Sequence, residues 1–204
     1  MAANLIDAKF ELVVYDLSTT ACAAAADIGA KVAHSPTAAA DGAHFLVTML
    51  PNDKALRSVV TPELLASLAD GAVHISCSTV HPETNRALAA AHAAAGSALV
   101  GAPIFARADG VAARQASVVV GGDADAFARA RPLLDATASG VWHFGADAGA
   151  GNVVKLCGNF LIASAIESCA EACTLAERSG LDREAVMGML SSTLFDCLIY
   201  RGYG

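Results

Sequence analysis

The segment AVHISCSTVHPETNRALAAAHAAAGSALVGAP (residues 72–103) contains, in order, a predicted strand, a helix and a second strand. AVHIS (72–76) and SALVGAP (97–103) are short apolar runs with β-branched residues, which is typical of buried strands. Between them Pro82 starts an alanine-rich helical stretch that runs to Ala95. Strands that are apolar throughout, each followed by a helix, indicate a parallel sheet covered on both faces.

The same alternation continues in both directions from this segment. Ser18 is placed to cap the helix after the first strand, Gly29 to end that helix, and Pro51 to stop the third strand. A loop is expected after Pro103, and a helix across residues 127–134. The other predicted strands are ELVVYD (11–16), AKVA (30–33), HFLVTML (44–50), ASVVVGG (116–122) and VWHFG (141–145).

The pattern changes after Gly145, because only helices are predicted beyond it. One helix is expected from Gly149 to about Ser179, and another from Asp182 to about Leu190. The sequence therefore predicts a doubly wound α/β domain over residues 1–145, followed over residues 146–204 by the start of an all-α domain.

Composition narrows the classes of partner. The chain has 204 residues, of which 55% are hydrophobic and 16% are charged, so it can bury a sizeable core. Its net charge is −7, and its 13 lysines and arginines form no cluster. Because nucleic acids and acidic lipid surfaces bind clustered positive charge, we expect neither nucleic acid nor a membrane as partner.

The cysteines and histidines give no clear metal-ligand pattern. The six cysteines are scattered without a CxxC pair, and the first ten residues lack the basic stretch and apolar run of a signal peptide, so we expect a cytoplasmic protein. Cys169 and Cys173 are one helical turn apart, either as a metal pair or, in the simpler interpretation, as small buried residues of a helix. The six histidines show no ligand spacing, and no metal is expected.

The stretch GAGNVVKLCGN (149–159) holds the most informative polar residues. It lies in the longest charge-poor run, residues 148–166, for which we expect a buried helix and not a membrane span. On a helix, Asn152, Lys155 and Asn159 share one face. Lys155 either extends to the surface from the helix start or remains desolvated, and a desolvated lysine suits acid–base chemistry near neutral pH.

Lys155 and Asn159, in the setting G-x-G-x-x-x-K-x-x-x-N, resemble the signature of the β-hydroxyacid dehydrogenases, which include 3-hydroxyisobutyrate dehydrogenase, tartronate semialdehyde reductase and plant-type glyoxylate reductases. The resemblance covers nearly the whole chain and implies a Rossmann-like dinucleotide-binding domain followed by a helical domain. The other matching segments are VTMLP (47–51), SCSTVHPET (76–84), GAPIFARADG (101–110) and VVGGDADAFARARPLLDA (119–136).

The resemblance implies a catalytic pair and a substrate site. Lys155 would give a proton to the substrate oxygen as hydride arrives from a nicotinamide, and would accept it in the reverse direction. Asn159 would orient the substrate. Ser78 and Thr79 would offer hydrogen-bond donors to the substrate carboxylate or to the cofactor.

The resemblance also implies where a cofactor binds. Asp16 is similar to the acidic residue that hydrogen-bonds the adenine ribose, and a carboxylate there would repel a 2′-phosphate, so we expect NAD in preference to NADP. Asp16 as a turn or cap residue at the strand end is the alternative. Met49, Leu50 and Pro51 would form an apolar wall beside the cofactor, and Thr79 would reach it from the neighbouring loop.

One departure from the family lies at the two ends. The family begins with a strand and a G-x-G-x-M-G loop before an M-A-x-N-L helix, whereas this sequence starts at Met1-Ala-Ala-Asn4-Leu5. It stops at TLFDCLIYRGYG (193–204), where the family continues through further helices. Either the start has been assigned at an internal methionine or the chain is truncated. In the second case we expect a domain without its first strand and glycine loop, in which the flanking strands face an empty slot.

A second departure is Phe105-Ala106-Arg107, where the family has S-G-G and backbone amides that usually receive the substrate carboxylate. Phe105 narrows that space. Arg107 either replaces the amides with a guanidinium or is an exposed loop residue. The variation resembles the branch that borders the imine reductases, although a lysine at position 155 favours carbonyl or alcohol chemistry.

Two hypotheses of different classes follow from these residues. The first is an NAD(P)-dependent oxidoreductase that moves hydride between nicotinamide and a small hydroxy or oxo acid of the 3-hydroxyisobutyrate type. The second is a non-catalytic, truncated remnant of such an enzyme that acts as an oligomerising or structural module. Because the resemblance implies that the long helix from Gly149 packs between subunits, we expect a homodimer or homotetramer in either case.

Overall fold

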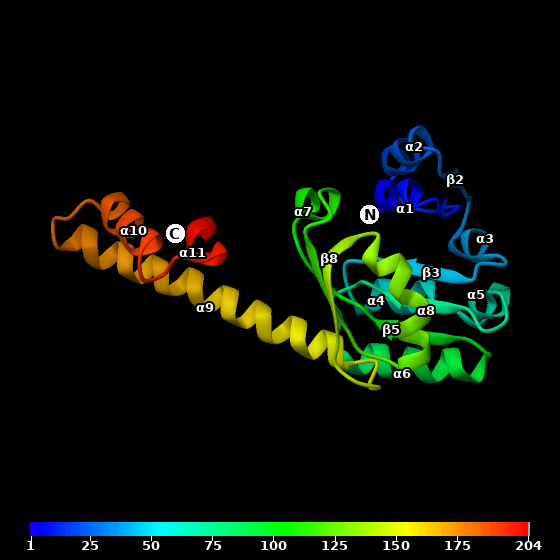
Figure 1. Cartoon of the computed structure of the whole chain (residues 1–204). Helices are drawn as coiled ribbons and strands as arrows, with labels where there is room; N and C mark the ends of the chain where they lie inside the picture. The colour runs from blue at the N-terminus through cyan, green and yellow to red at the C-terminus, as the bar shows by residue number, and fades with distance from the viewer. Residues whose placement is uncertain (204) are drawn as a thin grey trace. The chain divides into compact units, whose positions relative to one another are not determined.

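The computed structural model describes residues 1–203, and its contacts divide the chain into two compact units, Met1–Lys155 and Leu156–Gly204 (Figure 1). The strands are β1 (Val13–Val14), β2 (Lys31–Val32), β3 (Phe45–Thr48), β4 (Val73–Ser76), β5 (Ala98–Gly101), β6 (Ile104–Phe105), β7 (Ala116–Val120) and β8 (Ala138–His143). The helices are α1 (Ala2–Asp7), α2 (Thr19–Asp27), α3 (Pro36–Ala40), α4 (Asp53–Val59), α5 (Pro62–Ser67), α6 (Pro82–Ala94), α7 (Ala108–Ala112), α8 (Ala124–Asp135), α9 (Ala150–Arg178), α10 (Arg183–Ser192) and α11 (Leu198–Tyr203).

The centre of the first unit is the parallel sheet β3-β4-β5. Its register pairs Phe45 with Val73 and Val73 with Ala98, and all four residues of β4 are buried. Burial on both faces explains why these strands are apolar throughout instead of alternating. The predicted doubly wound α/β architecture is confirmed.

Two hydrophobic clusters cover the two faces of this sheet. On one face α1 and α8 pack over β4 and β5, with Leu5, Leu133 and Leu134 against Ile75 and Val100. The cluster on the other face is built from α4, α5, α6 and β5, and its buried members are Leu56, Val60, Leu65, Val80, Leu88, Leu99 and Ala148. Figure 1 shows α6 and α8 on either side of the strands.

The sheet β6-β7-β8 is mixed, with one antiparallel and one parallel strand pair. β7 and β8 are parallel, but β6 pairs with β7 in the antiparallel direction, with Phe105 opposite Ser117. The prediction of a loop immediately after Pro103 was therefore wrong for Ile104 and Phe105. A backbone bridge between Gly101 and Gly121 connects this sheet to the end of β5.

The strands β1 and β2 form a separate two-stranded parallel sheet. Ser18 caps α2 as predicted, because its hydroxyl accepts a hydrogen bond from Ala21 N at 3.2 Å. Both strands are much shorter than predicted, and Val13 and Val32 are 42% and 47% exposed. Among residues 1–203 no strand joins β1 to β3 by hydrogen bonds.

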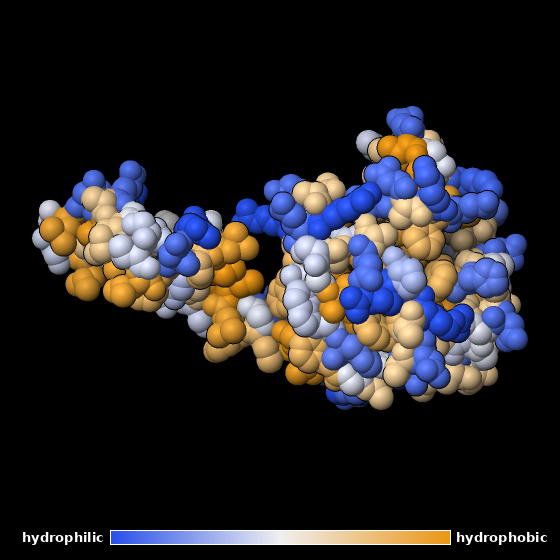
Figure 2. All heavy atoms as spheres, viewed as in Figure 1, coloured by the Kyte–Doolittle hydropathy of each residue, from blue (hydrophilic) through white to orange (hydrophobic). Residues whose placement is uncertain are grey.

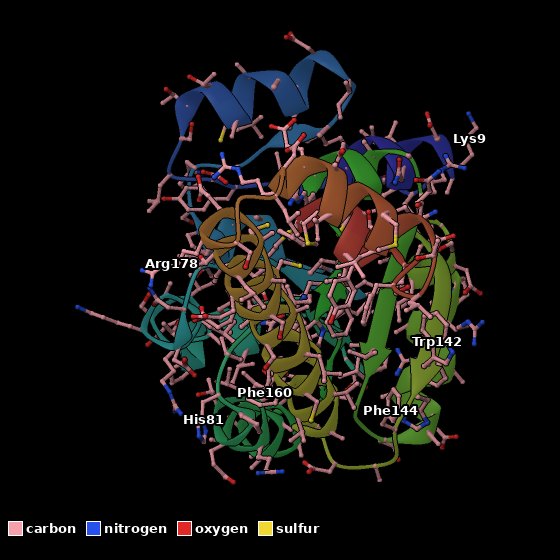
Figure 3. The ribbon with its side chains drawn as sticks, turned by 90° about the vertical axis from the view of Figure 1, so that its left-hand side faces the viewer. Lys9, His81, Trp142, Phe144, Phe160 and Arg178 are labelled. Carbon is pink, nitrogen blue, oxygen red and sulfur yellow. The ribbon has the colours of Figure 1, made fainter. Side chains whose placement is uncertain are left out.

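The helix α9 differs most from its prediction. Its length is 29 residues, close to the expected extent, but the expectation of a buried helix was wrong. Within α9 the described side chains are mostly exposed, including Phe160 at 70% and Leu161 at 66% (Figure 3). By length and hydropathy alone α9 is long and apolar enough to cross a membrane, which is weak evidence for a span.

Candidate active site

Three chain segments meet at the carboxyl ends of β3 and β4, where ligands bind in open α/β sheets. The backbone N–H of Leu50, after β3, donates to Ser78 Oγ at 2.8 Å, after β4. The side-chain amide of Asn152, near the start of α9, donates to the carbonyls of Ser78 at 3.1 Å and Val80 at 2.9 Å. The structure thus brings together the predicted residues Leu50 and Ser78 and attaches the helix that carries Lys155 to them.

Asn152 is an important residue of this arrangement, and the sequence did not single it out for a role. It is fully buried, and its Oδ1 accepts a hydrogen bond from Asn85 Nδ2 of α6 at 2.7 Å. Because it grips the carbonyls on both sides of Thr79, it fixes the backbone of that loop and leaves the Thr79 side chain exposed. The only sequence signal was its place on the same helix face as Lys155.

Glycines allow α9 to start directly against the sheet. A Cβ at Gly151 would lie 2.6 Å from Val119 O and 2.7 Å from Gly101 O, which is closer than real contacts allow. Arg86 of α6 adds a second fixing point, since its Nε and Nη2 lie 2.9 and 2.6 Å from the carboxylate oxygens of Asp147, just before α9. The first turns of α9 are therefore held in place by backbone contact, an amide and an ion pair.

Lys155 lies one turn after Asn152 and is half-buried. Its Nζ is 3.9 Å from the centroid of the Phe105 ring, a cation–π contact. Burial lowers the pKa of the Lys155 ammonium from its ordinary value. Of the two interpretations left open by the sequence, this geometry fits the partly desolvated lysine.

The other predicted site residues are exposed. Asn159 is one turn beyond Lys155 on α9, and it is exposed. Arg107 is exposed and occupies the N-cap position of α7. Met49 is 56% exposed and Pro51 is exposed, as apolar side chains at a surface that could receive a ligand.

Asp16 follows β1 and is exposed. Its Oδ1 accepts a hydrogen bond from Ser18 N at 2.8 Å, so it makes the turn contact that the alternative interpretation required. That contact uses Oδ1, and the side chain is exposed.

The described residues fit part of a dinucleotide. Asp16 is available for the ribose end, and Met49, Leu50, Pro51 and Thr79 for the nicotinamide end. Among residues 1–203, neither the turn from β1 to α2 nor the turn from β3 to α4 contains the glycines that would let a helix N-terminus hold a pyrophosphate. Within the same residues no group of three or more metal-ligating side chains lies together.

Hydrogen bonds also connect four buried or partly buried polar residues behind the site. Thr48 Oγ1 and His74 Nε2 are 2.8 Å apart, His74 Nδ1 and His92 Nε2 are 2.9 Å apart, and His92 Nδ1 and Ser97 Oγ are 2.8 Å apart. Burial lowers the pKa of His92 to about 4, and burial together with His92 lowers that of His74 well below its ordinary value. Scattered histidines in the sequence gave no sign of this chain.

Two family descriptions match the sequence in succession. Residues 1–145 match the NAD binding domain of 6-phosphogluconate dehydrogenase, and residues 149–201 match the NAD-binding domain of NADP-dependent 3-hydroxyisobutyrate dehydrogenase.

Named relatives agree with these matches. The chain is 39% identical over 184 residues to 3-hydroxyisobutyrate dehydrogenase of Pseudomonas aeruginosa, covering 89% of this chain and 61% of the relative. It is 33% identical over 206 residues to an uncharacterized oxidoreductase of Bacillus subtilis, covering 100% of this chain and 72% of the relative. The chain therefore spans between about three fifths and three quarters of the length of these relatives.

Solved structures show the same fold. The 3-hydroxyisobutyrate dehydrogenase of Mycobacterium tuberculosis, solved with L-serine, superimposes with a TM-score of 0.89 at 31% identity, over 97% of this chain and 67% of that one. An imine reductase of Streptomyces aurantiacus superimposes with a TM-score of 0.84 at 21% identity, over 95% of this chain and 68% of that one, and shows the shared fold alone.

Proposed function

This chain belongs to the β-hydroxyacid dehydrogenase family, and from that membership we propose that it moves a hydride between a nicotinamide cofactor and a small hydroxy or oxo acid of the 3-hydroxyisobutyrate type. The observation that carries the proposal is Lys155. A half-buried ammonium with a lowered pKa stands on a helix start that Asn152 attaches to the Ser78–Val80 loop.

The chemistry of Lys155 is proton transfer. Hydride addition to a carbonyl leaves negative charge on its oxygen, and the Lys155 ammonium donates a proton there. In the oxidation direction the neutral amine accepts the hydroxyl proton. Burial favours the neutral form and so brings the pKa closer to the working pH.

Substrate positioning is assigned to four residues. The Thr79 side chain and the Ser78 hydroxyl hydrogen offer donors from the loop after β4. Asn159 orients the substrate from α9, and Arg107 contributes a guanidinium for the carboxylate. These roles come from the family resemblance. The exposed Thr79 side chain supports its role, whereas Ser78 is buried and its Oγ accepts a hydrogen bond from Leu50 N.

The family's cofactor is NAD or NADP, which supplies or accepts the hydride. We assign NAD as the preferred form, because the Asp16 carboxylate would repel a 2′-phosphate. Met49, Leu50 and Pro51 cover the cofactor on the β3 side. A cytoplasmic location is part of the proposal, supported by six free cysteines.

A homodimer or homotetramer is the proposed assembly. Figure 2 shows hydrophobic residues on the surface of the part formed by α9 to α11. Phe160, Leu161 and Leu175 of α9 are each at least 66% exposed. Apolar surface of this kind is typical of an interface. The other proposed partner is a small hydroxy or oxo acid as substrate. Neither nucleic acid nor a membrane is proposed as a partner.

The separate β1–β2 sheet favours a second candidate function, a non-catalytic module that keeps the fold and acts through association. The two candidates differ in cofactor binding. They are separated by titration with NADH and NADPH, followed by the fluorescence of the cofactor and of Trp142. The oxidoreductase gives saturable binding that is tighter for NADH than for NADPH. Trp142 is 50% exposed on β8, and Figure 3 marks it there. A folded chain that binds neither cofactor contradicts the oxidoreductase.

Lys155→Met tests the mechanism, since methionine preserves the chain length without the amine. Turnover falls by roughly a hundredfold to ten-thousandfold while NADH affinity is unchanged. Lys9→Met, at an exposed lysine of the same unit, is the matched control and leaves turnover intact. Normal turnover by the Lys155 variant would rule out its role.

A further inference from the structure

Phe105 is held in place by backbone contacts between its segment and β7. It is the last residue of β6 and pairs with Ser117 of β7 in the antiparallel register. Just before it, Pro103 O accepts a hydrogen bond from Val119 N at 3.2 Å, and Pro103 is buried. The ring is half-buried. Its position is therefore set by the sheet and not by a free loop.

Lys155, the other partner of the cation–π contact, is also held in place by backbone and side-chain contacts. Gly151 touches the backbone of β7 and β5, and Asn152 grips the loop after β4, so the turn that precedes Lys155 has little freedom. The distance of 3.9 Å from Nζ to the ring centroid is thus a contact between two fixed elements.

The Phe105 ring also stabilises the positive charge of Lys155. Within residues 1–203 no carboxylate forms an ion pair with Lys155, and burial disfavours its charged form. An aromatic face carries partial negative charge and attracts an ammonium. It also orients the Nζ hydrogens, because the attraction is strongest over the centre of the ring.

The same ring limits what can approach Nζ. A substrate oxygen that receives a proton must come within about 3 Å of Nζ, and it must do so on the side away from the ring. A substituent on the reacting carbon that points toward β6 then meets the ring itself.

We propose that Phe105 is a positioning and specificity-determining residue: its ring orients the Lys155 ammonium and disfavours substrates with a bulky group on the reacting carbon. This inference rests on the proposed function. It adds a residue that the family pattern does not contain, since small residues stand at this position in the resemblance.

The positioning part is tested by nuclear magnetic resonance on the 204-residue chain, without turnover. Because Nζ lies over the Phe105 ring, we expect the ring current to shift the protons on the adjacent Cε upfield. Phe105→Leu abolishes that upfield shift, and the conservative Phe105→Tyr retains it. Lys155→Arg assigns the signal. A Lys155 Cε signal at the same position in wild type and Phe105→Leu overturns the contact.

The specificity part is tested by binding, with a series of 3-hydroxy acids that carry hydrogen, methyl, ethyl or propyl on the hydroxyl-bearing carbon, in the presence of NADH. Calorimetry on the wild-type chain gives affinities that fall by about tenfold or more from hydrogen to propyl. Phe105→Ser, which restores a small residue, reduces that difference to about threefold or less, while Phe105→Tyr keeps it. An unchanged order in the serine variant overturns the inference.

Turnover separates orientation from simple packing. Phe105→Leu lowers kcat for the smallest acid by about threefold to tenfold with little change in KM, because the ammonium loses its orientation and not its substrate. Phe105→Tyr restores kcat. If no acid of the series binds wild type or any variant, the proposed function itself fails and the specificity part fails with it, whereas the ring-current result still decides the positioning part.

Discussion

The two parallel sheets of the first unit differ sharply in how they are held. In β3-β4-β5 every residue of β4 is buried, and hydrophobic clusters cover both faces. In β1-β2 each strand has two paired residues, and three of the four are exposed. Parallel strands are stable when buried on both faces, so the same kind of pairing is supported in one sheet and poorly supported in the other.

This difference divides the candidate cofactor site. Leu50, Ser78 and the start of α9 are joined by hydrogen bonds to the well-packed sheet. Asp16 is carried by the weakly packed one. A dinucleotide that contacts both sheets therefore binds a preformed site at β3-β4-β5 but must order the Asp16 end, which reduces its apparent affinity.

Amide hydrogen exchange measures the opening free energy of each sheet directly, and the largest expected effect is the difference between the two sheets. Val73 N donates to His44 O at 3.0 Å, and Lys31 N donates to Leu12 O at 2.9 Å, so both amides are hydrogen-bonded. We expect Lys31 and Ala33 to exchange at least about a thousandfold faster than Val73, equivalent to roughly 4 kcal/mol of opening free energy. Equal protection would mean that β1-β2 opens only with the whole unit.

Acid should weaken the well-packed sheet through its buried histidines. The unfolded imidazole titrates near pH 6.5, whereas burial lowers the pKa of folded His92 to about 4. As the pH falls through this window the unfolded chain takes up the proton first. The free energy of unfolding is therefore complete above about pH 6.5 and falls by up to about 3 kcal/mol as pH 4 is approached. Urea denaturation between pH 7.5 and 4 measures it.

The histidine effect has a matched control. His92→Gln retains polar groups beside His74 but cannot take up the proton, so its stability falls less than that of wild type over the same window. His44→Gln changes an exposed histidine of the neighbouring segment and leaves the wild-type profile unchanged. Parallel profiles for wild type and His92→Gln would contradict the assignment to this residue.

Matched valine substitutions compare packing in the two sheets. Val73 of β4 is fully buried and Val32 of β2 is 47% exposed. Val73→Ala should lower the free energy of unfolding by about 2 kcal/mol, through lost burial and a residual cavity. Val32→Ala should change it by less than about 0.5 kcal/mol. Urea denaturation at pH 7.5 checks both values. Equal losses of unfolding free energy in the two variants would contradict the difference in packing between the sheets.

The sequence predicted the well-packed region best. Apolar runs with β-branched residues located β3, β4, β5 and β7 to within a few residues, because burial on both faces leaves a continuous signal. Ser18 and Pro82 marked helix starts by local chemistry, and both were confirmed. β1 and β2 were overestimated in length, since an apolar run shows that a strand can form and not what it pairs with.

Contacts between distant segments were beyond prediction. Phe105 and Lys155 are fifty positions apart, and the antiparallel turn of β6 that brings them together has no periodic signature. The chain through His74 and His92 depends on the register of two strands and a helix. Asn152 was recognised only as a neighbour of Lys155 on a helix face, because its partners are backbone carbonyls of another segment.

Cofactor choice is the smallest expected effect and the one that depends on the weakly packed sheet. Asp16→Ala removes the carboxylate that disfavours a 2′-phosphate, so the preference for NADH over NADPH should narrow by about tenfold, roughly 1.4 kcal/mol. Fluorescence titration with both cofactors measures the ratio. Asp27→Ala, at the end of α2, removes an exposed charge nearby in sequence and should leave the ratio unchanged.

Hydrogen exchange then shows whether the ribose end is ordered by ligand. If Asp16 holds the ribose, saturating NADH slows exchange at Lys31 and Ala33 in wild type, because binding adds its free energy to the closed form of β1-β2. In Asp16→Ala the same occupancy gives less protection there. If NADH binds and leaves those amides unprotected in both proteins, Asp16 acts only as the turn residue that bonds Ser18, and the preference for NADH must arise on the well-packed side.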